Sequence, residues 1–253
     1  MASLKTLKPI LVTGGAKRIG HAIVQRFASL GHPVVIHASP RTAEVADEET
    51  QKLVGLGYKA RYLIADLSIV ETTALLINQA SEFYGPLGIL VNNASLFDVD
   101  DAKDFDLDLY DMHMAVNLRA PILLARDFYK SFSKNDTGAI INIIDQRVWR
   151  LNPQYFSYTL AKSALWTATQ TMAQAFAPHI RVNAVGPGPV LPNAALGEKE
   201  FVKEYQAIPL GQSVDVSSIV DAVVYLCNAK SVTGQMIAVD GGQHLSWQTP
   251  DIQ

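Results

Sequence analysis

The sequence predicts a single-domain α/β Rossmann fold: a doubly wound, seven-stranded parallel sheet with helices on both faces. Two observations lead to this expectation. Seven short apolar runs rich in β-branched residues alternate with helical patterns along the chain, as expected for parallel strands joined by crossover helices. Each run is also nearly continuous in apolar residues, which is typical of strands covered on both faces.

Length, composition and charge fit one soluble domain, which we assign to residues 1–253. Hydrophobic residues make up 49% of the chain and charged residues 18%, and the formal net charge is -3. Neither nucleic acid nor a membrane is therefore expected as a partner. No apolar run approaches the roughly 20 residues that span a bilayer, and the amino terminus lacks a signal-peptide layout. Cys227 is the only cysteine, so no metal site is predicted, and the expected location is a reducing cytoplasm.

The strands and helices can be assigned in chain order. The predicted strands are 9–14, 33–38, 61–66, 88–94, 138–145, 180–188 and 235–242. The first helix is expected to end at Gly31, which suits a C-terminal cap. The pattern Ser68-x-x-Glu71 predicts a capping box before the third helical segment. The stretch 189–212 is long, partly charged and dotted with Pro and Gly, so we expect a loop that forms a lid over a substrate.

A glycine-rich turn follows the first strand and opens the first helix. Glycines let a phosphate approach the backbone closely, and the amino end of a helix attracts its charge. The fourth strand also ends in small residues, which allow the backbone of this turn to approach a bound dinucleotide closely. The expected contacts at these two turns are Gly14, Lys17, Arg18, Ile19, Gly20, Asn93, Ala94 and Ser95.

The end of the second strand favours NADPH over NADH. An NAD site would place a carboxylate there, whereas this chain has His37, Ser39 and Arg41 and no acid. These three side chains can receive the extra negative charge of a 2′-phosphate. After the third strand, Asp66 and Leu67 are expected beside the adenine. Alternatively, Asp66 is an acidic residue at the start of the following helix, beside Ser68, and makes no contact with the adenine.

Taken together, the motifs resemble the short-chain dehydrogenase/reductase family along essentially the whole chain. The segments that carry the resemblance are TGGAKRIG, NNAS, VNLRAP, YTLAK, IRVNAVGPGPV and VTGQMIAVDGG. The resemblance implies that Tyr158 delivers a proton and that Lys162 binds the nicotinamide ribose and lowers the tyrosine pKa. It further implies that Asn117 holds a proton-relaying water and that Pro187 and Gly188 flank the nicotinamide. Family members are commonly tetramers, so a homotetramer is expected.

One position departs from the common family pattern. Thirteen residues before Tyr158, where most members have a serine, this chain has Asp145. A carboxylate there would repel the alkoxide charge that develops when a carbonyl is reduced. It suits a C=N bond in a heterocycle, because a carboxylic acid can supply the proton that the ring nitrogen accepts.

The pteridine reductases, with the related dihydromonapterin and dihydrofolate reductases of bacteria, share this replacement. Lys17 and Arg18 are similar to the basic pair of that subgroup, Phe97 lies where the subgroup stacks the pterin, and Tyr155 lies where it has a pocket-wall tyrosine. The resemblance implies a set of substrate contacts: Arg18, Ser95, Phe97, Asp145, Tyr155 and Tyr158.

The leading hypothesis is an NADPH-dependent reductase of a pterin, dihydropterin or dihydrofolate C=N bond. A second hypothesis is a carbonyl reductase of acyl thioesters, sugars or steroids that tolerates Asp145. A third is a non-catalytic NADPH-binding module. A comparison of pterin turnover with acyl-thioester turnover would separate the first two hypotheses. NADPH binding without any turnover would support the third hypothesis.

Overall fold

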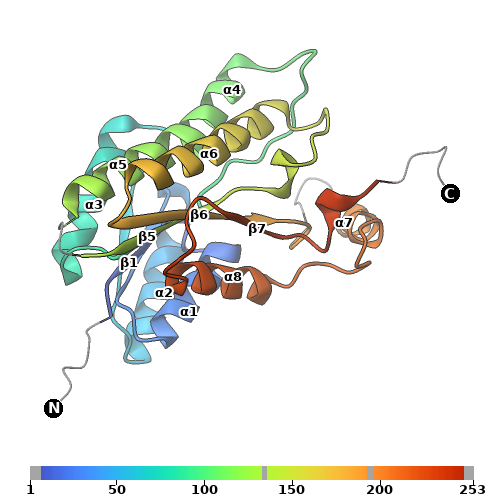
Figure 1. Cartoon of the computed structure of the whole chain (residues 1–253). Helices are drawn as coiled ribbons and strands as arrows, with labels where there is room; N and C mark the ends of the chain where they lie inside the picture. Colours follow the sequence, from blue (N-terminus) through green and yellow to red (C-terminus); the bar gives the residue numbers. More distant parts are fainter. Residues whose placement is uncertain (1–6, 133–135, 193–196, 248–253) are drawn as a thin grey trace.

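The computed structural model describes residues 7–132, 136–192 and 197–247 and confirms the predicted fold (Figure 1). One sheet of seven parallel strands has the order β3-β2-β1-β4-β5-β6-β7. All seven predicted strands are present: β1 (Ile10–Val12), β2 (Val34–Ala38), β3 (Ala60–Ile64), β4 (Ile89–Asn92), β5 (Gly138–Ile143), β6 (Ile180–Pro187) and β7 (Met236–Val239). The strand order reverses between β1 and β4, and such a switch point is where open α/β sheets bind ligands.

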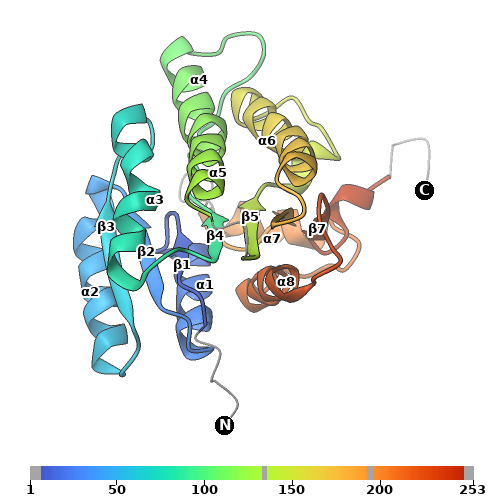
Figure 2. The same ribbon diagram turned by 60° about the vertical axis from the view of Figure 1, so that its left-hand side comes forward.

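Helices cover both faces of the sheet (Figure 2). They are α1 (Arg18–Ser29), α2 (Ala43–Gly55), α3 (Val70–Tyr84), α4 (Leu107–Met114), α5 (Ala120–Ser131), α6 (Phe156–Ala175), α7 (Gly197–Gln206) and α8 (Val216–Asn228). Helices α1, α2 and α8 pack on one face, and α3, α5 and α6 pack on the other. Among the described residues, no helix is both long and apolar enough to cross a bilayer.

The alternation of side chains along each strand divides the core into these two layers. In β1, Ile10 and Val12 pack toward α1 and α8, while Leu11 packs toward α3 and α5. All three are fully buried, as the continuous apolar run predicted. The prediction that every strand is covered on both faces is wrong at the sheet edge, where Ile64 of β3 is 38% exposed. An edge strand has a neighbouring strand on one side only.

Two predicted helix ends have different outcomes. Gly31 follows α1 with a φ of +91°, and the Gly31 and His32 N–H groups donate to carbonyls of the last turn, so the predicted cap is confirmed. The prediction of a capping box before α3 is wrong. Helix α3 begins at Val70 without a side-chain cap, and the Ser68 hydroxyl donates instead to Asp66 at 2.7 Å.

The predicted lid is also not wholly a loop. Residues 197–206 form α7, and residues 193–196 lie outside the described part of the chain. Helix α7 is amphipathic, and Phe201 and Tyr205, one turn apart, contact each other edge to face at 5.3 Å. The spacing of these two aromatics was the signal for a helix in an otherwise charged segment.

Candidate active site

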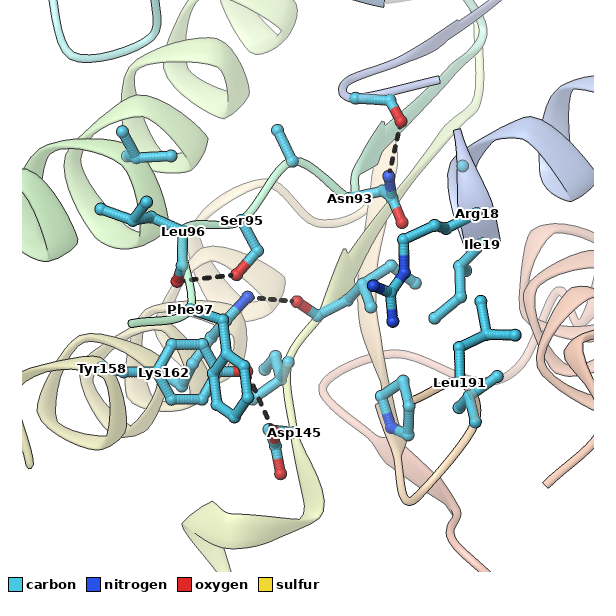
Figure 3. A pocket seen from close by; sticks show the side chains of 18 of the residues that line it. Arg18, Ile19, Asn93, Ser95, Leu96, Phe97, Asp145, Tyr158, Lys162 and Leu191 are labelled. Atoms are coloured by element: carbon cyan, nitrogen blue, oxygen red, sulfur yellow. Dashed lines mark hydrogen bonds between the residues drawn. The ribbon is translucent and has the colours of Figure 1, made fainter. Parts of the chain in front are cut away.

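A pocket of about 1220 Å³ opens along the carboxyl ends of the strands. The turns after β1, β3, β4, β5 and β6 line it, together with the end of β2. Every residue predicted for the site lines this pocket except Asn117. Figure 3 shows Arg18, Ile19 and Leu191 across the pocket from Phe97 and Tyr158. Leu191 belongs to the predicted lid, 189–212, although it had not been singled out as a site residue.

The glycine-rich turn brings the amino end of α1 into the pocket. Gly14 adopts a φ of +61°, which favours glycine. A Cβ atom at Gly20 would lie 2.2 Å from the Gly14 carbonyl oxygen and 2.5 Å from Asn93 Nδ2, so no side chain fits there. Helix α1 has no side-chain cap on its first turn, and uncapped N–H groups at a helix start suit a phosphate.

Substitution of Gly20 by alanine is therefore expected to distort this turn. The added methyl group cannot be accommodated without moving either Gly14 or Asn93. We expect Gly20→Ala to weaken dinucleotide binding by at least tenfold, measured by fluorescence titration with NADPH. Gly55→Ala in helix α2, where a Cβ atom meets nothing within 4 Å, is the matched control. Unchanged binding in Gly20→Ala would show that the turn has room to adjust.

Asn93 and Thr13 hold the turns after β4 and β1 together. The Thr13 hydroxyl oxygen accepts hydrogen bonds from the Asn93 and Ala94 N–H groups at 2.9 and 3.0 Å. The Asn93 amide donates to the carbonyls of Thr13 and Gly14. Sequence reasoning missed Thr13, although its place at the end of β1 beside the glycines was a usable signal.

His37 has a different role from the predicted one. Its Nδ1 accepts from the Gly14 N–H at 3.2 Å, so Nε2 carries the hydrogen and donates to the Ala65 carbonyl at 3.1 Å. Burial lowers the pKa of His37 to about 4. The ring is neutral and both nitrogens are engaged. His37 therefore cannot offer positive charge to a 2′-phosphate, and it positions the Gly14 turn instead.

The other predicted cofactor contacts after β2 and β3 lie at the same end of the pocket. Ser39, Arg41 and Leu67 line it together with Asp66. Asp66 Oδ1 accepts from the Ser68 N–H and hydroxyl at 2.9 and 2.7 Å, and these bonds lower the pKa of its carboxyl group. Asp66 is therefore a helix-entry acid, the alternative that the sequence left open, and it also faces the pocket.

Tyr158 and Asp145 form a hydrogen-bonded pair in the pocket (Figure 3). Tyr158 comes from the first turn of α6 and donates to Asp145 Oδ2 at 2.9 Å. Burial raises the pKa of Asp145. Burial, followed by the Asp145 carboxylate, raises the pKa of Tyr158 well above its usual range. The phenol is thus a proton donor, and Asp145 binds a proton more readily than an exposed acid.

Lys162 lies one helical turn after Tyr158. Its Nζ donates to the Ile143 carbonyl at 2.8 Å and lies 5.6 Å from the centroid of the Tyr158 ring. Burial lowers the pKa of Lys162 to about 8. The charged group that most clearly lowers the pKa of Tyr158 here is the guanidinium of Arg147, and the expected effect of Lys162 on that pKa stays a prediction.

Asn117 lies beneath the pocket, in a π-helical turn, η2 (Ala115–Arg119), between α4 and α5. Its Oδ1 accepts from the Leu96 N–H at 2.9 Å and from the Ser95 hydroxyl at 3.1 Å, and its Nδ2 donates to the Leu96 carbonyl. The side chain is fully buried. Asn117 therefore anchors the segment after β4, and its predicted role in holding a water stays a prediction.

Phe97 and Tyr155 form one wall of the pocket. The two rings are stacked, with centroids 4.1 Å apart and planes 4° from parallel, and Tyr158 meets the Phe97 ring edge-on at 4.7 Å. Tyr155 has a φ of +58°, a strained conformation for a side-chain-bearing residue. A hydrogen bond from the Asp98 N–H to His113 Nε2 fixes the segment that follows Phe97.

Arg147 is the main functional candidate that the sequence reasoning missed. It lies in a short 3-10 turn, η3 (Gln146–Val148), that Asp145 caps by accepting from the Arg147 N–H at 2.8 Å. The guanidinium lies 4.9 Å from the Tyr155 ring centroid and 5.8 Å from that of Phe97. A basic residue two positions after Asp145 was the available signal.

Comparisons with known proteins agree with this geometry. Two solved structures described as FolM alternative dihydrofolate reductase 1 in complex with NADP are similar over nearly the whole chain. The Brucella canis protein is 47% identical with a TM-score of 0.91, covering 97% of both chains. The Brucella suis protein is 48% identical with a TM-score of 0.94, covering 97% of this chain and 98% of its own.

Other relatives carry different activities in their names. L-xylulose reductase from Bos taurus is 33% identical over 240 residues, which are 92% of this chain and 94% of the relative. A short-chain dehydrogenase/reductase of Serratia marcescens is 31% identical, with a TM-score of 0.87 and coverage of 94% and 98%. Residues 14–244 match the family described as enoyl-(acyl carrier protein) reductase. The parallel sheet, the helix that carries Tyr158 and Lys162, and these relatives together show that the chain belongs to the short-chain dehydrogenase/reductase family of oxidoreductases.

Proposed function

We propose that the protein is an NADPH-dependent reductase of a C=N bond in a pterin, a dihydropterin or dihydrofolate. The observation that carries the proposal is the contact between the Tyr158 hydroxyl and the Asp145 carboxylate. A ring nitrogen that becomes an amine needs a proton, and two groups that can each carry one meet at this point. The two similar Brucella structures, described as alternative dihydrofolate reductases, support the same substrate class.

The residues present fit a dinucleotide. The uncapped start of α1 and the tight Gly14–Gly20 turn suit its phosphates, and Lys162, which lines the pocket, would hold the nicotinamide ribose. Ser39 and Arg41 line the pocket where a 2′-phosphate would be received. When bound, NADPH supplies the hydride. The two similar Brucella structures, which contain NADP, support this cofactor.

The protein's own residues supply the proton. The Tyr158 hydroxyl donates to Asp145 and cannot also donate to a substrate with the same hydrogen. When Asp145 takes up a proton, it can become the donor in this hydrogen bond, which frees the phenol to protonate a ring nitrogen. A carboxyl group whose pKa is raised by burial keeps its proton to higher pH than an exposed acid and is therefore better suited to this task. One face of the Phe97 ring is stacked on Tyr155, and Phe97 remains 37% exposed at the pocket wall, where a flat ring can pack against it.

A carbonyl reductase is the second candidate, because the curated relatives include L-xylulose reductases. The buried carboxylate argues against it, since an alkoxide would form beside a negative charge. The deciding experiment follows NADPH oxidation with dihydrobiopterin, dihydrofolate, L-xylulose and an acetoacetyl thioester. Turnover of only the last two would overturn the proposal, and NADPH binding without turnover of any would indicate a non-catalytic module.

Arg41 is expected to select NADPH through the 2′-phosphate. Arg41→Ala should weaken NADPH binding by about 1–3 kcal/mol, the range of a charge-assisted hydrogen bond, and leave NADH binding nearly unchanged. Calorimetric titration of both cofactors would measure the difference, with Arg61→Ala on the outer strand β3 as the control. Equal losses for NADPH and NADH in Arg41→Ala would rule out this assignment.

We further propose the homotetramer that the family resemblance implies. Ile122 of α5 and Leu160 of α6 are 37% and 40% exposed, and apolar side chains on outer helix faces suit an interface between subunits. Sedimentation equilibrium measures the mass directly. A monomeric mass at micromolar concentration would contradict the proposal.

A further inference from the structure

Arg147 lies beside the acid of the proposed proton-transfer pair. Its Nε is 4.0 Å from Asp145 Oδ2, the same oxygen that accepts from Tyr158. Its backbone N–H donates to the other carboxylate oxygen at 2.8 Å. The Arg147 side chain is 14% exposed and that of Asp145 is 18% exposed, so water screens the two charges only weakly.

The guanidinium is held in this place by the aromatic wall. It lies within cation–π distance of the Tyr155 and Phe97 rings, at 4.9 and 5.8 Å from their centroids. The two rings are stacked on each other and are therefore positioned as a unit. Arg147 cannot leave Asp145 without giving up these contacts, so the positive charge stays fixed beside the carboxyl group.

Within the described part of the chain, the charged and titratable groups that influence Asp145 come from two elements. Arg147 belongs to η3, and Tyr158 and Lys162 belong to α6. Burial raises the pKa of Asp145, and among the groups that oppose this effect Arg147 has the largest influence. The Lys162 ammonium is engaged by the Ile143 carbonyl. Arg147 is thus the principal counter-charge of Asp145.

We propose that Arg147 is a positioning residue for proton transfer, which acts through Asp145 and sets the pH range in which that carboxyl group carries its proton. The inference rests on the proposed function. In the reduction, the substrate carbon gains the hydride of NADPH, and the ring nitrogen gains the Tyr158 proton as the Asp145 proton moves to the Tyr158 oxygen. Asp145 ends as a carboxylate, which Arg147 stabilises until water reprotonates it.

The test measures the titration of Asp145 directly, by NMR of ¹³C-labelled carboxyl groups in the protein without cofactor or substrate. The Asp145 signal is assigned by its loss in Asp145→Asn. In Arg147→Gln the titration is expected to move to higher pH, because removing a cation favours the neutral acid. Arg147→Lys should titrate close to the wild type. Arg150→Gln, which alters an exposed cation of the same segment, should leave the titration unchanged.

The pH dependence of kcat gives the second readout. If Asp145 must be protonated to act, kcat falls as pH rises through its pKa, and this limb should move to higher pH in Arg147→Gln and return in Arg147→Lys. An unmoved Asp145 titration in Arg147→Gln, or an equal shift in Arg150→Gln, would overturn the inference. Because the NMR titration needs no turnover, a wild type inactive on pterins would refute the proposed function separately.

Discussion

Tyr158→Phe is expected to abolish reduction while NADPH remains bound. The phenol supplies a proton at the point where the ring nitrogen needs one, and its removal deletes only the hydroxyl group that donates to Asp145. The aromatic ring and its edge-on contact with Phe97 are retained. We expect kcat to fall by roughly 10²–10⁴-fold or more, as is typical of lost general acid catalysis, with NADPH affinity changed less than threefold.

Stopped-flow measurement of NADPH oxidation with a dihydropterin, alongside a fluorescence titration of NADPH, tests this result. Tyr225→Phe, on the exposed face of α8, is the matched control and should behave as the wild type. If Tyr158→Phe retained substantial activity, the proton would have to come directly from Asp145.

Asp145→Asn is expected to lower pterin turnover by roughly 10²–10⁴-fold. The amide keeps the shape of the side chain and can still accept from the Arg147 N–H. The group facing Tyr158 becomes an N–H donor in place of an acceptor, however, so the Tyr158 hydroxyl loses its acceptor and the relay loses its acid. The limb of the pH profile at which turnover falls with rising pH should disappear, because the group with the raised pKa is gone.

Asp145→Ser separates the two candidate activities. It should lose pterin turnover and can gain weak carbonyl reduction, because a neutral hydroxyl donates to an alkoxide that a carboxylate would repel. Both variants are assayed across pH 5–9 with dihydrobiopterin and an acetoacetyl thioester. Pterin reduction at the wild-type rate by Asp145→Asn would show that Asp145 serves only as a spacer.

Features that depend on local sequence were predictable. The seven strands follow from continuous apolar runs, and the end of α1 follows from Gly31 at a positive φ. Helix α7 in the predicted lid was missed because Gly197, the prolines before it and its five charged residues masked the short apolar spacing. The capping box failed for a related reason: Asp66, two residues earlier, competes for the Ser68 hydroxyl.

By itself, the sequence determined the order of the elements, the glycine-rich turn and the placing of Tyr158 and Lys162 one turn apart on a helix. Periodicity and turn chemistry are properties of neighbouring residues, so they can be read along the chain. Only the tertiary structure decided the charge states. His37 is neutral because it is buried, although its ring donates to Ala65, 28 residues away. Arg147 faces Asp145 because Tyr155 and Phe97 hold it there. Burial and contacts between distant segments set a pKa, and neither is written in local sequence.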